Sequence, residues 1–358
     1  MRLHRSFLTR AIVVLTAIAA PQSLRAGPKE DFAKLEDEME SAHEEFVSAH
    51  EAGGDAKPAA DDRRLDILKK MDALADSANG LPDGAEIAVR TFLWSARFEM
   101  DREKLVSRFE RIATYHSGSD STLEAFEAVP YVYRLSATPE TWTRSLRRIV
   151  DQTDKKEIKL GALRTEGLVQ LDAGKPPAAR AAFEEITRLG ADADAVKLAR
   201  GYLFEIEHLQ IGMPAPDFTA RTIDGKEISL KSLRGKVVLL DFWATWCGKC
   251  LTETSHLKAA AERFKDKPFV IVGVSLDDFK EMLVATIEQK GLPGLQIWDD
   301  TGRENPVGVL YNVQDLPQWY LIDADGVIRA RNPFGEKLIP SVDSLFSQQP
   351  PRNENADH

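Results

Sequence analysis

The sequence predicts an α/β domain over residues 209–346, preceded by an all-α region over residues 63–208. Apolar residues recur at helical spacing through the first region, where alternating β-branched residues are scarce. In the second region, continuous apolar runs alternate with amphipathic segments, which is typical of strands and helices around a central sheet. A chain of 358 residues is also longer than one hydrophobic core usually serves.

The first 26 residues have the organisation of a secretory signal peptide. MRLHRSFLTR carries three arginines and no acid, and the apolar run AIVVLTAIAA that follows is too short to span a bilayer comfortably. Cleavage is expected after Ala26, but Leu24 is larger than the residue usual at that place, so an uncleaved anchor remains open. We therefore expect the protein in the periplasm or cell envelope.

The composition is that of an ordinary globular protein, with 43% hydrophobic and 29% charged residues. The net charge of −10 argues against nucleic-acid partners and against an anionic membrane surface. We expect neither.

Residues 27–62 are predicted to form an acidic amphipathic helix followed by a linker. The linker is GGDAKPAADD at residues 53–62, whose composition is typical of such segments. The helix has a seam of apolar residues at alternating steps of three and four, which is too short a repeat to favour a dimeric coiled coil over docking on its own domain. The seam comprises Phe32, Leu35, Met39, Ala42, Phe46 and Ala49.

Two passages of the all-α region predict the same helix–turn–helix unit. They are FLWSARFEMDREKLVSRFERI and GLVQLDAGKPPAARAAFEEITRL, each with an aromatic residue late in its second helix, Phe109 and Phe183. The second passage resembles a degenerate tetratricopeptide hairpin. Binding of a protein partner and a role as a plain helical spacer both remain open for this region.

The α/β region begins with DGK at residues 224–226, which predicts a hairpin turn between short strands. KVVLLDFW and FVIVGVSL are continuous apolar runs that suit buried strands, and LKAAAERFKD and FKEMLVATIEQK suit helices. WYLIDADGVIRA predicts a strand, a turn and a strand, and a last helix should end near Phe346. The polar residues 347–358 predict a disordered tail.

Both cysteines of the chain, Cys247 and Cys250, lie in the stretch DFWATWCGKC. A bridge between them would close a very small loop and would therefore stabilise the fold little. Cys247 follows a predicted strand and begins a predicted helix, where backbone N–H groups and the helix dipole lower a thiol pKa. Cys250 is one helical turn further along the same face. The pair is therefore predicted to be a redox couple, with an inert disulfide as the alternative.

The segments GMPAPDF, DGKEISLKSLRGKVVLLDFWATWC, VGVSLD, YNVQDLP and YLIDADGVI occur in this order over about the last two-fifths of the chain. In this combination the chain resembles the thioredoxin-like redoxins of the TlpA and ResA kind, which are extracytoplasmic thiol–disulfide oxidoreductases. The resemblance implies a thioredoxin-like fold and an enzyme that acts on protein thiols and disulfides, most often as a reductase. It also implies a membrane thiol protein as electron donor, and no cofactor.

The resemblance implies roles for individual residues. Cys247 and Cys250 match the attacking and resolving cysteines. Pro317 matches a cis-proline that faces the disulfide, and the backbone of Leu316 would pair with an incoming peptide like an added strand. Glu253 matches an acid kept three residues past the second cysteine.

Three further residues lie beside the cysteine motif or are expected to change the pKa of its thiols. Trp246 matches the tryptophan beside the motif. Lys249 stands where proline is common, and a cation there should lower the pKa of the thiol of Cys247 and favour the reduced form. Asp241, buried below Cys250, should have a raised pKa and could take a proton from Cys250, while its negative charge disfavours a thiolate. Asp241 and Glu253 could instead be structural acids, and the direction of the reaction stays open between reductase, oxidase and isomerase.

Two other functions remain open. Peroxide reduction needs a proline and a threonine before the reactive cysteine, and Thr245 is present but no proline lies between Val237 and Cys247. The helical region could instead recruit a partner, with redox chemistry secondary. WCGKC resembles half a zinc site, but the chain has no second CxxC or CxxH, so no metal is expected.

Overall fold

The computed structural model describes residues 27–51, 57–98, 101–135 and 139–348. The expected signal peptide, residues 1–26, lies outside the described residues, as does nearly all of the expected tail. The chain divides into two compact units after Ala199. This division falls inside α10 (Ala193–His208) and not at the expected boundary after residue 208. The last turns of α10 join the second unit because Phe204 and Leu209 pack in its core.

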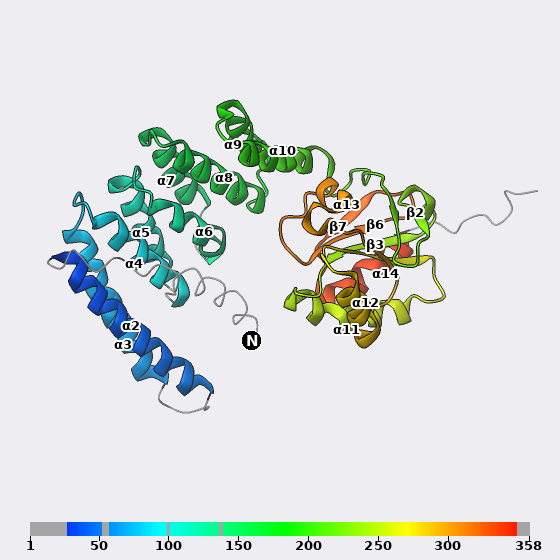
Figure 1. Ribbon diagram of the computed structural model, residues 1–358, viewed down its shortest axis with the longest axis horizontal. Helices are drawn as coiled ribbons and strands as arrows, with labels where there is room; N and C mark the ends of the chain where they lie inside the picture. The colour runs from blue at the N-terminus through cyan, green and yellow to red at the C-terminus, as the bar shows by residue number, and fades with distance from the viewer. Residues whose placement is uncertain (1–26, 52–56, 99–100, 136–138, 349–358) are drawn as a thin grey trace, which may run out of the picture. The chain divides into compact units, whose positions relative to one another are not determined.

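Among its described residues, the first unit is entirely helical, as predicted (Figure 1). Its helices follow one another with short connections. They are α2 (Pro28–Glu51), α3 (Lys57–Ser77), α4 (Gly84–Phe98), α5 (Arg102–Tyr115), α6 (Thr122–Val132), the 3-10 turn η1 (Tyr133–Leu135), α7 (Pro139–Gln152), α8 (Lys156–Asp172), α9 (Pro176–Leu189) and the start of α10.

The acidic helix α2 docks on its own unit, as its seam predicted. Phe32, Met39 and Ala42 are buried on the face that meets α3, where they pack with Leu68 and Met71. The linker prediction was wrong in its second half, since α3 begins at Lys57 and includes residues 57–62. That half is rich in alanine and charged residues, which are compatible with a helix, and its proline falls in the first turn.

Both predicted helix–turn–helix units are present, as α4 with α5 and as α8 with α9. Phe109 packs with Phe92 and Trp142 at ring-centroid distances of 5.6 and 5.2 Å, so it ties α4 and α5 to α7. Phe183 is fully buried against Gly167 of α8, where any side chain would collide with the ring. The two late aromatic residues are therefore core residues of their hairpins.

The second unit is built on a five-stranded mixed sheet in the order β5-β4-β3-β6-β7. Strands β3, β4 and β5 run parallel, and β6 and β7 are antiparallel to their neighbours. A separate hairpin joins β1 and β2 around the predicted turn at residues 224–226. The strands are β1 (Thr219–Arg221), β2 (Glu227–Ser229), β3 (Val237–Trp243), β4 (Phe269–Ser275), β5 (Leu295–Ile297), β6 (Gln318–Ile322) and β7 (Ile328–Arg331).

Helices cover both faces of this sheet (Figure 1). Val237 and Leu239 of β3 point to the face covered by α11 (Gly248–Arg263) and α14 (Leu338–Gln348). The alternate residues Val238 and Leu240 point to the opposite face, which is covered by α13 (Pro306–Leu310) and by the end of α10. Strand β3 is thus buried on both faces, as its continuous apolar run predicted.

One further helix and three short 3-10 turns complete the second unit. α12 (Lys280–Lys290) follows β4, and short 3-10 turns lie at η2 (Lys231–Leu233), η3 (Gly302–Glu304) and η4 (Gly335–Lys337). α14 ends at Gln348, two residues beyond the end expected near Phe346.

Candidate active site

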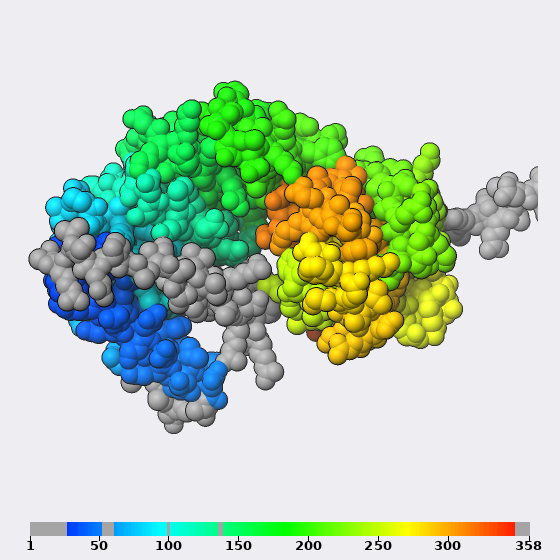
Figure 2. All heavy atoms as spheres, viewed as in Figure 1, coloured from blue at the N-terminus to red at the C-terminus, as the bar shows by residue number. Residues whose placement is uncertain are grey.

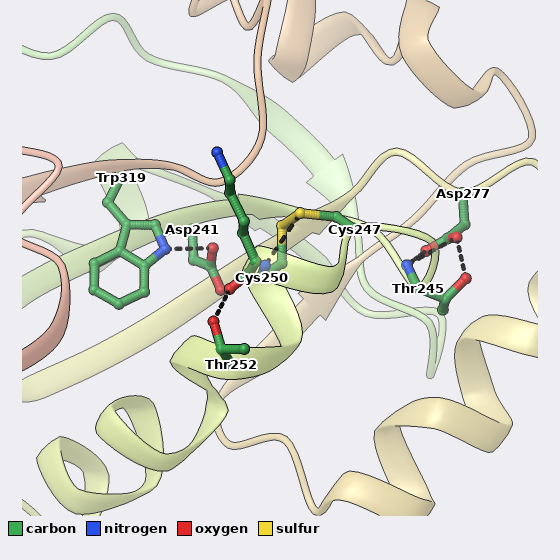
Figure 3. The surroundings of a disulfide bond; sticks show 8 residues. Asp241, Thr245, Cys247, Cys250, Thr252, Asp277 and Trp319 are labelled. Atoms are coloured by element: carbon green, nitrogen blue, oxygen red, sulfur yellow. Dashed lines mark hydrogen bonds between the residues drawn. A yellow bond between two sulfur atoms is a disulfide. The ribbon is translucent and has the colours of Figure 1, made fainter. Parts of the chain in front are cut away.

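The two cysteines lie where the central strand passes into a helix. β3 ends at Trp243, and after a short loop Cys247 is the N-cap residue of α11. Cys247 and Cys250 form a disulfide, and the Cys250 N–H donates to Cys247 Sγ at 3.1 Å (Figure 3). In the reduced protein the same N–H and the positive end of the α11 dipole would stabilise a thiolate at Cys247.

The structure brings the cis-proline loop to the disulfide, as the resemblance implied. The Leu316–Pro317 peptide bond is cis. Leu316 packs against the apolar cluster that contains both cysteines. Cys247 and Cys250 are only 9% and 6% exposed, whereas Trp246 beside them is 45% exposed. The disulfide is therefore nearly buried, with exposed Trp246 next to it in the chain and Leu316 packed on its cluster.

Asp241 lies on β3, on the face of the sheet that α11 covers. Its carboxylate is buried, and Oδ1 accepts a hydrogen bond of 2.6 Å from Trp319 Nε1 of the neighbouring strand β6 (Figure 3). Burial raises the pKa of Asp241 to about 7, the Trp319 bond opposes this rise, and the charge of Glu253 adds to it. A carboxyl with such a pKa can exchange protons near neutral pH.

Glu253 lies one turn after Cys250 on α11. Its Oε2 accepts a hydrogen bond of 2.8 Å from the backbone N–H of Gly335, next to α14. His256 Nδ1 is 3.3 Å from the same oxygen. Glu253 is thus held in place by its surroundings, and its charge acts on Asp241.

Lys249 lies between the cysteines and is half-buried. Desolvation lowers the pKa of its ammonium group, and Asp315 acts in the opposite direction. A partly desolvated cation is screened less by water, so it acts more strongly on nearby charges than an exposed one would.

Asp277 is a site residue that the sequence reasoning missed. It is 3% exposed and follows β4, and its carboxylate accepts bonds from the Thr245 N–H and from Thr245 Oγ1 at 2.6 Å (Figure 3). Ser275 Oγ donates to it at 2.8 Å, and Trp298 Nε1 donates to its backbone carbonyl. Asp277 therefore fixes the loop that leads into Cys247. The only signal in the sequence was an aspartate directly after a buried strand.

Across the part of the chain that the structure describes, His, Cys, Asp and Glu side chains nowhere gather in a group of three suited to a metal ion. Within the same ranges, each helix is too short or too polar to span a bilayer.

Three features define a thioredoxin-like oxidoreductase domain: a mixed sheet, an N-cap cysteine bridged to the residue three positions on, and a cis-proline whose preceding residue packs on the cysteine cluster. Comparisons with known proteins agree with this class. Residues 211–331 match the AhpC/TSA family. The chain is 34% identical over 131 residues to the thiol-disulfide oxidoreductase ResA of Bacillus thuringiensis. The aligned residues cover 37% of this chain and 74% of that protein. The chain therefore belongs to the ResA family of thiol–disulfide oxidoreductases.

The chain is also similar to two further known proteins. The thioredoxin-like protein YneN of Bacillus subtilis is 32% identical over 123 residues, covering 34% of this chain and 70% of its own. The solved thioredoxin domain of a thiol-disulfide oxidoreductase from Bacteroides vulgatus is 32% identical, with 38% of this chain and 96% of that chain covered and a TM-score of 0.36. Peroxide reduction, the other activity considered from the sequence, is not favoured by these relatives.

Proposed function

We propose that this protein reduces disulfide bonds of protein substrates in the cell envelope, using Cys247 and Cys250 as its redox couple. The observation that carries the proposal is the placement of Cys247 at the N-cap of α11, with its sulfur bonded by the Cys250 N–H. The adjacent Leu316–Pro317 segment would pair with the substrate backbone like an added strand.

The reaction has two exchange steps. The Cys247 thiolate attacks one sulfur of the substrate disulfide, and the other substrate sulfur leaves as a thiolate. Cys250, after losing its proton, attacks Cys247 Sγ, and the second substrate sulfur leaves. The substrate thus gains two electrons and, with protons from water, two thiols, while Cys247 and Cys250 become a disulfide.

Asp241 would accept the proton of Cys250 in the second step, because its pKa of about 7 lets it take up a proton at neutral pH. Glu253 would help to hold this value through its charge. Lys249 would favour the thiolate and so the reduced form of the couple, whereas the charge of Asp241 would disfavour a thiolate. Because these two effects oppose each other, the reductase direction is proposed from the family, with a membrane thiol protein as the electron donor.

The rest of the chain is assigned as follows. Residues 1–26 would export the protein, which agrees with a disulfide chemistry outside the reducing cytosol. The helical part would comprise residues 27–62 and 63–208, and it would bind a partner or act as a spacer. The redox domain would comprise residues 209–346, and residues 347–358 would form a tail.

The proposal is tested by turbidimetric reduction of insulin with dithiothreitol as donor. The Cys247→Ser variant should be inactive because it lacks the attacking sulfur. The Cys250→Ser variant should instead accumulate a mixed disulfide that gel electrophoresis separates without reductant. Unchanged turnover by the Cys247→Ser variant would rule the proposed cycle out.

A further inference from the structure

A buried carboxylate lies in the last turn of α10, just ahead of residues 211–331, the region that matches the AhpC/TSA family. Glu205 is 8% exposed, and it belongs to the second unit, which begins at Arg200. Its Oε2 accepts a hydrogen bond from Asn312 Nδ2 and its Oε1 accepts one from Arg331 Nη2, both at 2.7 Å. A buried ion pair is weak evidence of a contribution to stability, because desolvation offsets much of the attraction. The places of the two partners are therefore the better guide to what Glu205 does.

The first partner opens the segment that leads to the cis-proline. We call residues 312–317 the cis-proline segment, since they run from Asn312 to the proline of the cis peptide bond. Asn312 is 4% exposed and has a φ of 47°, a left-handed conformation that is costly for most residues. Its Oδ1 accepts a hydrogen bond of 2.9 Å from Gln314 Nε2, and it leaves no room for a side chain at Gly201 of α10. The start of the segment is thus held against α10.

The second partner acts on both ends of the same segment. The guanidinium of Arg331 lies over the Tyr320 ring, 5.3 Å from its centroid. The hydroxyl of Tyr320 donates to the Tyr311 carbonyl at 3.2 Å and accepts a hydrogen bond of 2.8 Å from Gln318 Nε2. Gln318 Nε2 also donates to the Tyr311 carbonyl, at 3.2 Å. Tyr311 directly precedes the cis-proline segment and Gln318 directly follows it, so these bonds close the segment into a loop.

The cis-proline segment reaches from the surface to the cluster around the disulfide. Gln314 and Asp315 are exposed, and Figure 2 shows the region around α13, in orange, at the surface of its unit. Leu316 packs against the cluster that contains Cys247 and Cys250. A loop that joins exposed backbone to the redox pair must be held from within if a substrate is to meet it in a single conformation.

We propose that Glu205 is a positioning residue, which holds the cis-proline segment in the conformation that pairs with substrate. It acts through Asn312 at the start of the segment and through Arg331 at its closure. This inference rests on the proposed function, because the segment is the surface on which the substrate of Cys247 would lie. A preformed segment loses less conformational entropy when a peptide pairs with it, so loss of Glu205 should weaken substrate binding more than it changes the cysteine chemistry. The end of α10 thus contributes to substrate binding from outside the region that matches the family.

The test uses two variants of the full-length protein. Glu205→Ala removes both hydrogen bonds. Glu205→Gln keeps an oxygen that can accept from Asn312 but loses the charge that pairs with Arg331, so it should have a smaller effect. Glu207→Ala and Glu207→Gln are the matched controls, because Glu207 is exposed and lies on the same helix.

Activity is read as initial rates of insulin reduction over a range of insulin concentrations, with dithiothreitol as donor. We expect KM to rise about tenfold in Glu205→Ala and about threefold in Glu205→Gln, with kcat within about twofold of the wild type, as lost substrate binding requires. The rate of Cys247 alkylation by iodoacetamide should be unchanged, which shows that the start of α11 is folded. Both Glu207 variants should keep the wild-type values.

Hydrogen exchange reports on the segment itself without any substrate. The Val313 N–H donates to the Gly308 carbonyl at 2.9 Å, and its exchange should become about tenfold faster in Glu205→Ala than in Glu207→Ala. An unchanged exchange rate or an unchanged KM would overturn the inference. A fall in kcat and in the alkylation rate as large as the rise in KM would do the same, because Glu205 would then support the whole unit and not the segment.

Failure of the proposed function looks different. Either Cys247→Ser would still reduce insulin, or the wild-type protein would not reduce it at all. In both cases the exchange of the Val313 amide would still respond to Glu205→Ala.

Discussion

Replacement of Asp241 by asparagine should stabilise the oxidised protein at alkaline pH and leave it nearly unchanged at acidic pH. Asp241 is buried and its pKa is raised from the ordinary 3.8 to about 7. Between these values the folded protein holds a proton that the unfolded chain has lost, so stability falls as pH rises through this window. Asparagine carries no charge at any pH and escapes this loss.

The magnitude follows from the same two values. At about 1.4 kcal/mol for each pH unit, the interval from 3.8 to about 7 gives about 4 kcal/mol as an upper estimate of the loss above pH 7. The substitution preserves the other interaction of this side chain, because the amide oxygen of asparagine can still accept the bond from Trp319 Nε1.

The assay is hydrogen exchange of the β3 and β6 amides, which reports opening of this sheet without interference from the helical unit. The free energy of opening at pH 8 should rise in Asp241→Asn by up to about 4 kcal/mol, with little change at pH 4. Asp266→Asn, at an exposed position of the same unit, is the control and should have little effect at either pH. An equal gain at both pH values, or a loss at pH 8, would refute the reasoning.

Three other predictions concern the loop, the tuning cation and the helical unit. Lys249→Met should raise the pKa of the Cys247 thiol, which is measured as a shift of the pH profile of Cys247 alkylation to higher pH. An unshifted profile would mean that the Lys249 cation does not act on the sulfur. Asp277→Ala should lower the free energy of unfolding in urea by about 3 kcal/mol and slow the attack by Cys247, because the Thr245 loop loses its hydrogen-bond acceptor. An unfolding free energy and a rate equal to those of the wild type would contradict the anchoring role of Asp277. Met39→Ala should cost about 2–5 kcal/mol in exchange protection of α2 but leave insulin reduction unchanged. Loss of both would show that the units are coupled.

The features that could be predicted from the sequence are those that depend on residues close together in the chain. The apolar run of β3, the turn at residues 224–226 and the position of Cys247 at a strand–helix junction depend on neighbouring residues. All three were predicted and are present. The late aromatic residues Phe109 and Phe183 were also identified from spacing within single hairpins.

The features that were missed depend on contacts between distant residues. β5 has only three residues, Leu295–Ile297, which is too short a run to show a period. Asp277 gains its role from Thr245, which lies 32 residues away. The early start of α3 at Lys57 was hidden because glycines precede it and made the whole segment look like a linker.

The division inside α10 was missed for the same reason. Glu205 accepts bonds from Asn312 and Arg331 at 2.7 Å, so the end of a helix that is periodic throughout belongs to the second unit. No property of the helix sequence alone shows where its partners change.

The central claim is that Cys247 is a thiolate at neutral pH. It is tested most directly by the rate of alkylation of Cys247 with iodoacetamide as a function of pH in the fully reduced protein, with each modified cysteine identified by mass spectrometry. The N-cap position predicts a midpoint between about 3.5 and 7.5, with Cys250 reacting far more slowly. A midpoint at or above the value of about 8.5 for a free thiol would contradict the account.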